Sequence, residues 1–290
     1  MLPLSPIAIL NAYDNATSLA ADQYQTLTDF SHAQDIANQV AQLRSSRGEK
    51  PLGYKIGFTN RSIWPVYGVS RPIWSPIYDT TVTQLPGSSA QISLDRFVEP
   101  RLEPEIVIGL RATPKDDSLS EIVRSVAWVA HGFEVVQSHF PNWRFTAAQA
   151  HACQGLHGAL LVGPRTSIQA NAQELAQTLS AAKVALCLER MSNGVRSLHL
   201  VEQGLGSNVL DGPIQALAFL VKGLGQEGKV LLPGAIITTG TLTDAQAMAQ
   251  GQRWRSHWLS TSIDDSNELK NTQANEVPDF LLSSLALDIV

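Results

Sequence analysis

The sequence is poor in the residues that mark several large classes of protein. Only two of its 290 residues are cysteines, and Cys153 and Cys187 form no CxxC pair, so no disulfide framework is expected. Charged residues make up 16% of the chain and the net charge is −5, with no basic block anywhere. Nucleic acid requires a positively charged surface, and we therefore expect no binding to it.

Long apolar runs and an early basic segment are also missing. No apolar run approaches the ~18 to 20 residues that a membrane-spanning helix needs. The first basic residue is Arg44, so the charged start of a secretory signal is lacking. We expect a cytoplasmic protein that is not associated with a membrane.

What the chain does contain is the composition of an ordinary globular protein, with 44% hydrophobic residues. Patterns typical of strands outnumber those of helices. The predicted helices come singly, over 31–45 after the capping box Ser31-His-Ala-Gln34, over 118–129, and from residues 171 and 213 onwards. This order favours an α+β fold, a mixed sheet or β-roll with packed helices, over a regular βαβ array.

Two carboxylates lie two residues apart in the stretch Arg101-Leu-Glu-Pro-Glu-Ile-Val-Ile108. Residues i and i+2 of a strand face the same side, so Glu103 and Glu105 are expected to point together. Two like charges side by side are costly unless a cation or a proton compensates them. The pair is interpreted either as half of a divalent-metal site or as surface glutamates on a solvated edge strand.

A second unusual stretch precedes this pair. Residues 51–59 predict a strand in which Lys55 lies between Gly53 and Gly57, and glycines inside a strand mark bulges or the close approach of another group. Residues 60–80 are too rich in aromatic residues and proline for a solvated linker. They are interpreted either as buried aromatic packing or as a loop that lines an apolar pocket.

Six segments occur in an order that resembles one known family. They are Gly53-Tyr-Lys55-Ile-Gly-Phe-Thr59, Glu103-Pro-Glu105-Ile, Phe133-Glu134-Val-Val, the Asn193-Gly194 hairpin, Gly212-Pro213 with its helix, and Pro233-Gly234 with Thr239-Gly240-Thr-Leu-Thr243. Each motif is weak alone, but six in register are fairly specific. Over residues 31–260 the chain resembles the 2-keto-4-pentenoate hydratase and 4-oxalocrotonate decarboxylase branch of the fumarylacetoacetate hydrolase superfamily.

The resemblance implies a fold and a division of the chain. The fold would be the mixed β-roll or sandwich of the fumarylacetoacetate hydrolase C-terminal type, with packed helices. A helical and strand cap region is expected over 1–80, packed on a catalytic core over 81–261. A polar linker and an apolar tail are expected over 262–290, and the tail would dock on this subunit or on a neighbour.

The resemblance also implies an active site built around Mg²⁺ or Mn²⁺. Three carboxylates would hold the ion: Glu103, Glu105 and Glu134. A catalytic lysine and an acidic site residue are implied at Lys55 and Asp79. Substrate contacts are expected at five positions in or beside the motifs and the aromatic loop: Tyr54, Arg61, Trp74, Thr239 and Thr241. Family members act on short 2-oxo or 2-hydroxydienoate acids and assemble as homo-oligomers.

The chemistry of these residue types agrees with the resemblance. Three carboxylates without a nearby His or Cys cluster suit a hard, oxygen-seeking ion, which would act as a Lewis acid on a 2-oxo acid. Lys55 could hold the substrate carboxylate or move a proton, but neighbouring glutamates oppose the lowered pKa that proton transfer requires. We favour an electrostatic role for Lys55 or that of a metal-tuned acid, and the alternative is a snorkelling surface lysine.

The chain departs from the family in two places. Many members have Asp-Ser-Arg where this sequence has Gln137-Ser138-His139, and an Ala-Asp-Asn-x-Ser segment is replaced by Ala152-Cys-Gln-Gly-Leu-His157. These changes indicate a different substrate or a weakened site. His139 and His157 are interpreted either as new acid–base groups or as ordinary packed or surface histidines.

Four functions remain open on the sequence. The leading hypothesis is a hydratase that adds water to a 2-oxo-4-enoate, or 2-hydroxy-2,4-dienoate, in aromatic-compound degradation. The second is decarboxylation of a 2-oxo-dienedioate, whose extra carboxylate needs a cation such as Arg61 or Arg71. An acylpyruvate-type C–C hydrolase needs a water-activating His/Glu pair, and none is evident at motif spacing. A non-catalytic partner subunit or small-acid binding protein on the same fold is the fourth.

Overall fold

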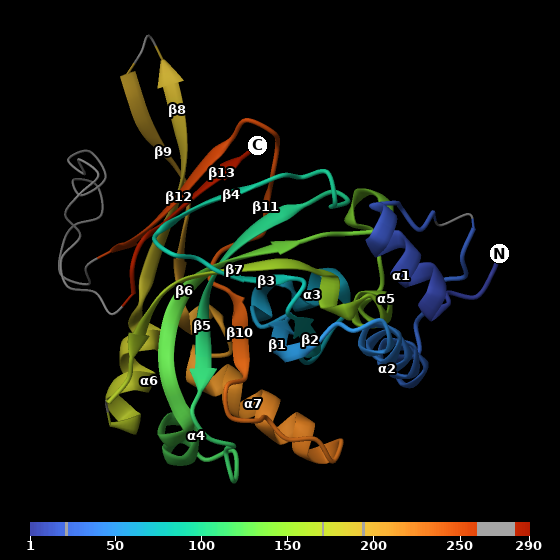
Figure 1. Cartoon of the computed structure of the whole chain (residues 1–290), viewed down its shortest axis with the longest axis horizontal. Coiled ribbons are helices and arrows are strands. Elements are labelled where there is room, and N and C mark those ends of the chain that lie inside the picture. Colours follow the sequence, from blue (N-terminus) through green and yellow to red (C-terminus); the bar gives the residue numbers. More distant parts are fainter. Residues whose placement is uncertain (21–22, 170, 193–194, 260–281) are drawn as a thin grey trace.

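The computed structural model describes residues 1–20, 23–169, 171–192, 195–259 and 282–290. Two β-sheets with helices around them form an α+β fold, in which the larger sheet curls into a half barrel (Figure 1). The α+β fold expected from the sequence is confirmed. Among the described residues, no helix has the length and apolar character to cross a membrane.

The larger sheet has eight strands in the order β2-β1-β10-β5-β6-β7-β3, and β11 pairs with β5 beside this path. The strands are β1 (Pro51–Gly57), β2 (Ile73–Tyr78), β3 (Val82–Gln84), β5 (Arg101–Leu110), β6 (Val126–Val136), β7 (His157–Ser167), β10 (Ile236–Thr241) and β11 (Gln246–Ala247). β5 pairs antiparallel with both β10 and β6, so it is a central strand. Burial on both faces explains the unbroken apolar run after Glu105.

The second sheet has five strands in the order β4-β13-β12-β8-β9. They are β4 (Ser89–Ile92), β8 (Lys183–Ser192), β9 (Val195–Leu205), β12 (Arg253–Leu259) and β13 (Leu285–Ile289). β13 pairs antiparallel with β12 and parallel with β4, so the C-terminal apolar segment docks within its own subunit. Along β12, Trp254, Ser256 and Trp258 are buried and alternate with less buried residues, as a sheet with one covered face requires.

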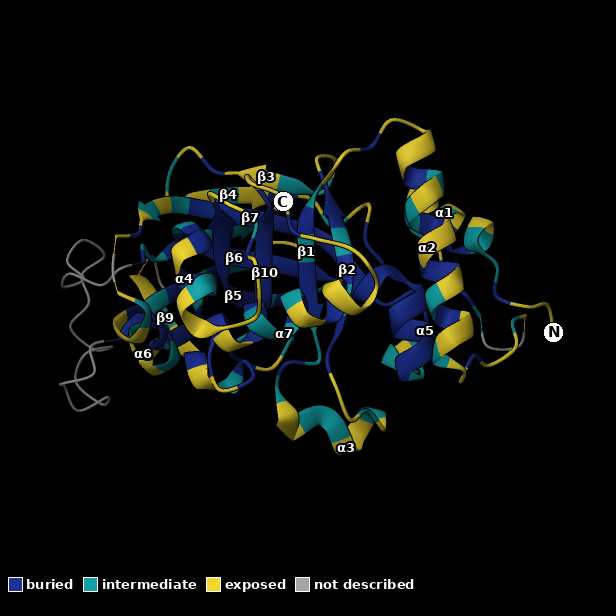
Figure 2. Cartoon of the chain, turned by 90° about the horizontal axis from the view of Figure 1, so that it is seen from below, coloured by how far each residue is buried: buried dark blue, intermediate teal, exposed yellow. Residues whose placement is uncertain are grey.

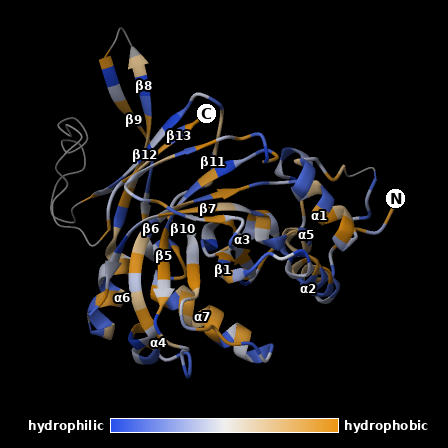
Figure 3. Ribbon diagram, viewed as in Figure 1, coloured by the Kyte–Doolittle hydropathy of each residue, from blue (hydrophilic) through white to orange (hydrophobic). Residues whose placement is uncertain are grey.

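The helices form two groups. They are α1 (Pro6–Asn15), α2 (Phe30–Ser46), α3 (Trp64–Tyr67), α4 (Leu119–Ser125), α5 (Ala147–Ala152), α6 (Ala172–Ala181) and α7 (Pro213–Gln226), with 3-10 turns at Arg61–Ile63, Pro141–Trp143, Gln154–Leu156 and Gly206–Asn208. Helices α4, α6 and α7 pack with the apolar strands β5, β6 and β10. Helices α1, α2 and α5 form a second core at the end of the molecule where the N-terminus lies (Figures 2 and 3).

Some helices differ from the prediction, and each difference has a local cause. Helix α2 begins at Phe30 because Asp29 is the N-cap and accepts a hydrogen bond from the His32 amide at 2.8 Å. The helix expected over 118–129 ends at Ser125, since the residues after it pair with β5 and β7 as strand β6. Helices α1 and α5 lie in segments that carried no helix prediction.

The three-part division of the chain stays a prediction. The expected cap region supplies β1 and β2 of the larger sheet, so part of it is continuous with the core. The polar linker predicted in the first part of 262–290 and the Asn193-Gly194 turn lie outside the described residues. The strands on either side of that turn, β8 and β9, pair antiparallel up to Ser192 and Val195.

Candidate metal centre and active site

Three glutamates from neighbouring strands converge on one point of the larger sheet. Glu103 and Glu105 lie on β5, and Glu134 lies on β6 directly opposite Glu103. One carboxylate oxygen from each lies within 4.8 Å of the others. Glu105 and Glu134 are fully buried and Glu103 is half-buried. The interpretation of a solvated edge strand is therefore wrong, and the triad could hold a metal ion.

The triad carries more negative charge than the protein around it neutralises. Burial raises the pKa of Glu103 to about 7, and the positive charge of Lys55 offsets only part of that effect. Burial and the charges of Glu134 and Glu103 raise the pKa of Glu105 well above its ordinary value. Three carboxylates this close cannot all be ionised without compensation. A bound divalent cation would supply the missing positive charge.

Glu105 is held through one of its oxygens, and the other has no partner. Oε2 accepts hydrogen bonds from the Gly240 amide at 2.8 Å and from the Thr238 hydroxyl. Gly240 lies in a bulge of β10 with φ +113°, and a Cβ there would meet Thr59 Oγ1 at 1.9 Å, so glycine is required.

The second oxygen, Glu105 Oε1, is buried without a hydrogen-bond partner among the described residues. A buried acceptor left unpaired is costly, and a place in a metal coordination shell accounts for it. The surrounding donors are carboxylate oxygens, which suit a hard divalent cation. The residues present therefore fit a metal ion.

Lys55 points from β1 at Glu134. Its Nζ lies 3.2 Å from Glu134 Oε2 and donates a hydrogen bond to the Gly155 carbonyl at 2.9 Å. Burial alone would lower the pKa of Lys55, but the charges of Glu134, Glu103 and Glu105 raise it. Burial would raise the pKa of Glu134, yet Lys55 and His157 lower it to about 2. With only 4% of its side chain exposed, Lys55 is a buried ammonium and not a snorkelling surface lysine.

His157, one of the two departures from the family pattern, contacts the triad. At the start of β7, its Nδ1 lies 2.7 Å from Glu134 Oε1 and its Nε2 lies 3.0 Å from Thr81 Oγ1. His139 lies elsewhere, with its ring against Tyr13 and Nδ1 donating to the Thr17 carbonyl at 3.0 Å. Burial lowers the pKa of His139 to about 4, so it is a packed neutral histidine.

A cavity of about 240 Å³ opens beside the triad. Its polar end contains Lys55, Glu103 and Thr241. Its walls are mainly apolar and aromatic and include Phe58, Val66, Tyr67, Val136, Phe145 and Leu156. The rings of Tyr67 and Phe145 stack at 5.2 Å. This arrangement of few polar groups in an apolar hollow is typical of small-molecule sites.

Some of the residues predicted for the site lie outside this cavity. Asp79 is exposed and accepts a hydrogen bond from the Lys50 amide at 2.9 Å. Arg61 is exposed and forms an ion pair with Asp211 at 2.6 Å. The guanidinium of Arg71 lies 5.8 Å from the Phe30 ring.

The remaining predicted substrate contacts do not share one surface. Thr241 lines the cavity, whereas Thr239 is buried and donates to the Ile106 carbonyl at 2.8 Å. Tyr54 and Trp74 line a separate hollow beside α2. Adjacent strand residues face opposite sides, so Tyr54 cannot share the face of Lys55.

Arg101 is a pocket residue to which the sequence analysis assigned no role. Its guanidinium lies 4.1 Å from the centre of the Trp143 ring, and both residues line the cavity. A signal was available, because Arg101 precedes Glu103 by two residues on the same strand and so shares its face. The aromatic walls from Trp143 and Phe145 carried no comparable signal, since they come from an irregular segment after β6.

Comparisons with known proteins show distant relatives over most of the chain. The chain is 25% identical over 224 residues to the 2-hydroxyhexa-2,4-dienoate hydratase of Comamonas testosteroni, covering 77% of this chain and 80% of the relative. It is 27% identical over 221 residues to a 4-oxalocrotonate decarboxylase of a Pseudomonas species, covering 76% and 79%. No family model matches the chain.

Solved structures show the same fold. The 4-oxalocrotonate decarboxylase of Pseudomonas putida G7, complexed with magnesium and adipate, superposes with a TM-score of 0.76 at 20% identity, covering 98% of this chain and 95% of that one. A Yersinia pestis CO92 protein assigned to the fumarylacetoacetate hydrolase family superposes with a TM-score of 0.51 at 14% identity, covering 83% and 94%. The chain is thus a distant homologue of the 2-keto-4-pentenoate hydratases and 4-oxalocrotonate decarboxylases, with the fold of the fumarylacetoacetate hydrolase superfamily.

Proposed function

We propose that the protein is a Mg²⁺- or Mn²⁺-dependent lyase that acts on a short 2-oxo acid, with hydration of a 2-hydroxy-2,4-dienoate as the leading activity. One observation carries the proposal: three carboxylates, one with a buried unpartnered oxygen, converge beside a buried lysine at the end of an apolar cavity. The relatives include a hydratase of this substrate class.

The proposed ligands are Glu103, Glu105 and Glu134, and the ion they hold supplies a Lewis acid for the 2-oxo group. Lys55 places a permanent positive charge beside that position, where it attracts the substrate carboxylate. Its raised pKa favours the protonated form, so Lys55 would act by charge or by donating a proton from Nζ, not as a resting base.

The cavity walls would bind the rest of the substrate. Phe58, Tyr67 and Phe145 present apolar surface to an uncharged diene tail and exclude bulk water from it. Electrostatic interactions at the polar end are stronger in a site from which water is excluded. The proposal does not extend to Asp79, because that side chain is exposed and lies outside the cavity.

Decarboxylation of a 2-oxo-dienedioate is the second candidate, and Arg101 is the observation that favours it. A second carboxylate on the substrate needs a cation, and Arg101 lines the cavity on the face of Glu103. Its stacking on Trp143 would hold the planar guanidinium in place. Arg61 and Arg71, the cations considered from the sequence, do not line this cavity.

The hydrolase alternative is weaker. The structure does bring a His/Glu pair together, but both ring nitrogens of His157 already have hydrogen-bond partners, Glu134 and Thr81. Neither nitrogen is free to activate a water molecule, as a hydrolytic mechanism requires.

The test compares two substrates on one protein. Protein stripped of metal is incubated with 2-hydroxypenta-2,4-dienoate and Mn²⁺, and the loss of dienol absorbance is followed with and without chelator. CO₂ release from 2-oxohex-3-enedioate is measured in parallel. Dienol loss that stops with chelator supports the hydratase, and CO₂ release alone supports the decarboxylase. Turnover that is insensitive to chelator contradicts the metal-dependent lyase, and binding without turnover favours a partner subunit. Light scattering tests the homo-oligomer that the resemblance implies.

A further inference from the structure

The two ring nitrogens of His157 join one proposed metal ligand, Glu134, to Thr81 in the turn between β2 and β3. Nδ1 lies 2.7 Å from Glu134 Oε1, Nε2 lies 3.0 Å from Thr81 Oγ1, and 3% of the side chain is exposed. We propose that His157 is a positioning residue, which fixes the Glu134 carboxylate for metal binding through its Nδ1–H, while Thr81 holds the other ring nitrogen. The inference rests on the proposed metal role of Glu134.

Glu134 needs such support because its position depends on a rotatable carboxylate. The terminal torsion of a glutamate is broad, so the strand alone does not set the plane of the two oxygens. Lys55 contacts Oε2 at 3.2 Å and His157 contacts Oε1 at 2.7 Å. Two contacts on different oxygens fix that plane, whereas either contact alone leaves the carboxylate free to turn about it.

The hydrogen-bond partners determine which nitrogen of His157 carries the hydrogen. An ionised carboxylate can only accept, so Nδ1–H donates to Glu134. Nε2 of the neutral ring is then an acceptor, and the Thr81 hydroxyl is its donor at 3.0 Å. The Tyr78 carbonyl, at 3.2 Å, is a second acceptor for the one hydrogen of this hydroxyl, and the hydroxyl oxygen accepts from the Tyr78 amide at 3.2 Å. The Glu134 carboxylate thus sets the tautomer, and loss of the Thr81 hydroxyl would remove the hydrogen bond that holds the Nε2 side of the ring.

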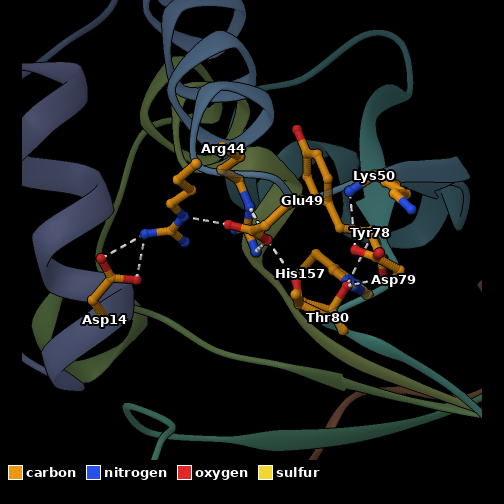
Figure 4. A network of polar contacts seen from close by, with 10 residues as sticks. Asp14, Arg44, Glu49, Lys50, Tyr78, Asp79, Thr80 and His157 are labelled. Carbon is orange, nitrogen blue, oxygen red and sulfur yellow. Dashed lines mark hydrogen bonds and ion pairs between the residues drawn. The ribbon is translucent and has the colours of Figure 1, made fainter.

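Thr81 is itself fixed by the loop that follows α2. In the turn after β2, Asp79 Oδ1 accepts from the Lys50 amide at 2.9 Å, and the Thr80 hydroxyl donates to Glu49 Oε2 at 2.5 Å (Figure 4). The turn therefore cannot follow a movement of the Glu134 carboxylate. Asp79, expected to be a catalytic residue, acts in this arrangement by anchoring the turn that presents Thr81.

The Glu49 carboxylate that anchors this turn is buried and neutralised by arginines. It pairs with Arg44 at 2.9 Å and with Arg47, which also binds Asp14 at 2.7 Å (Figure 4). The guanidinium of Arg44 lies 4.5 Å from the centre of the Tyr78 ring. These contacts connect the end of α2 to the turn, so the contacts that hold Thr81 extend into the helical part of the fold.

Metal affinity of variants tests the role of His157 directly. Partners that hydrogen-bond metal ligands typically contribute about 10- to 100-fold to metal affinity. In calorimetric titrations of metal-free protein with Mn²⁺, His157→Leu is expected to raise the Kd by about 10-fold or more. His157→Asn, whose side-chain nitrogen takes the place of Nδ1, is expected to stay within about 3-fold of the wild type. A His157→Leu protein with the wild-type Kd, or an Asn variant as weak as the Leu variant, overturns the proposal.

His139→Leu is the matched control, because it removes another buried histidine that contacts no proposed ligand. It is expected to lose stability and keep the wild-type Kd for Mn²⁺. Equal losses of affinity in the two leucine variants would mean that His157 acts only through stability. If His157→Leu does not fold, the same comparison is made between Thr81→Val and Thr81→Ser, where only the valine variant is expected to bind Mn²⁺ more weakly.

A spectroscopic measurement on the unmodified protein gives an independent result. Nitrogen-15 shifts of the His157 ring in the metal-free protein are expected to show hydrogen on Nδ1 and none on Nε2, and the opposite tautomer overturns the proposal. Failure of the proposed function has a different signature: wild-type protein that binds no Mn²⁺ refutes the metal centre itself. Wild-type binding with an unchanged His157→Leu Kd refutes only the positioning role.

Discussion

Replacing Glu105 by glutamine is expected to stabilise the metal-free protein while abolishing its affinity for metal. The glutamine oxygen can accept the two hydrogen bonds that Glu105 Oε2 accepts, from the Gly240 amide and the Thr238 hydroxyl. What is lost is one negative charge between Glu103 and Glu134. The fold benefits from that loss, whereas a divalent cation loses a ligand.

The magnitude follows from the pKa of the neighbouring carboxyl. Burial raises the pKa of Glu103 from 4.5 to about 7, and each unit corresponds to about 1.36 kcal/mol between the two protonation states. Ionising Glu103 therefore costs about 3 kcal/mol, which we halve because the side chain is half-buried and water screens it. Burial and the charges of Glu134 and Glu103 shift the pKa of Glu105 in the same direction. Taking the discounted cost at Glu103, about 1.5 kcal/mol, as the scale for one charge in this cluster, removal of the Glu105 charge is expected to raise the free energy of unfolding by at least that amount, or roughly 3 °C in Tm.

The gain must depend on pH with a definite sign. A carboxyl whose pKa is raised in the folded state holds its proton there after the unfolded chain has lost it. Stability of the metal-free protein therefore falls as pH rises from 4.5 through about 7, the interval set by Glu103. The pKa of Glu105 is raised in the same direction, so the advantage of Glu105→Gln is expected to be small below pH 4.5 and to grow as pH rises.

Urea unfolding of chelator-treated protein at several pH values measures this gain. Glu174→Gln is the control, because Glu174 is an exposed carboxylate on α6, and its effect is expected to stay within about 0.5 kcal/mol. A Glu105→Gln protein that is less stable than the wild type above neutral pH would refute the reasoning. A gain of equal size at every pH would also refute it, since charge relief would then not be the cause.

Three further predictions concern the supports and the specificity of the site. Gly240→Ala is expected to lower the free energy of unfolding in urea by about 3 kcal/mol or more, because the added Cβ would lie 1.9 Å from Thr59 Oγ1. Gly251→Ala is its control: the space around Gly251 is open, so only the positive φ should matter, at about 1 kcal/mol. Arg101→Met is expected to raise the KM for a dicarboxylate substrate by about 10-fold while leaving that for a monocarboxylate within about 2-fold, and equal changes in steady-state kinetics would contradict its role. Burial lowers the pKa of His139 from 6.5 to about 4, so the free energy of unfolding should fall as pH drops through that interval. His139→Leu should remove this fall, which amounts to about 3 kcal/mol at most, when unfolding in urea is followed against pH.

The alternation of side chains along a strand predicted the shared face of Glu103 and Glu105. Applied to β1, the same rule would have excluded Tyr54 from the site of Lys55. The two-residue spacing placed Glu103 and Glu105 on one face, as the structure shows. The same rule places Arg101 with them and places Tyr54 opposite Lys55, because neighbouring residues in a strand alternate. The aromatic content of residues 60–80 could not be divided in this way, because a loop has no fixed period. Tyr67 lines the cavity, whereas Trp74 lines another hollow.

The pairing of strands that are far apart in the sequence could not be predicted from local patterns. Glu134 meets Glu103 through the register of β5 against β6, which depends on the whole sheet. The contact of His157 with Thr81 depends on the parallel pairing of β3 with β7. The helix predicted over 118–129 ends early, at Ser125, for the same reason, since pairing as β6 overrode the helical period of the apolar residues that follow. The family resemblance supplied Glu134 and Lys55, but it could not supply His157, which departs from the family pattern.

Calorimetric titration of chelator-treated protein with Mn²⁺ tests the metal centre most directly. The account predicts one ion per chain, with binding abolished in Glu105→Gln and retained in Glu174→Gln. Absence of binding to the wild type, or a Glu105→Gln protein that titrates like the wild type, would contradict the assignment of the glutamate triad as the metal site.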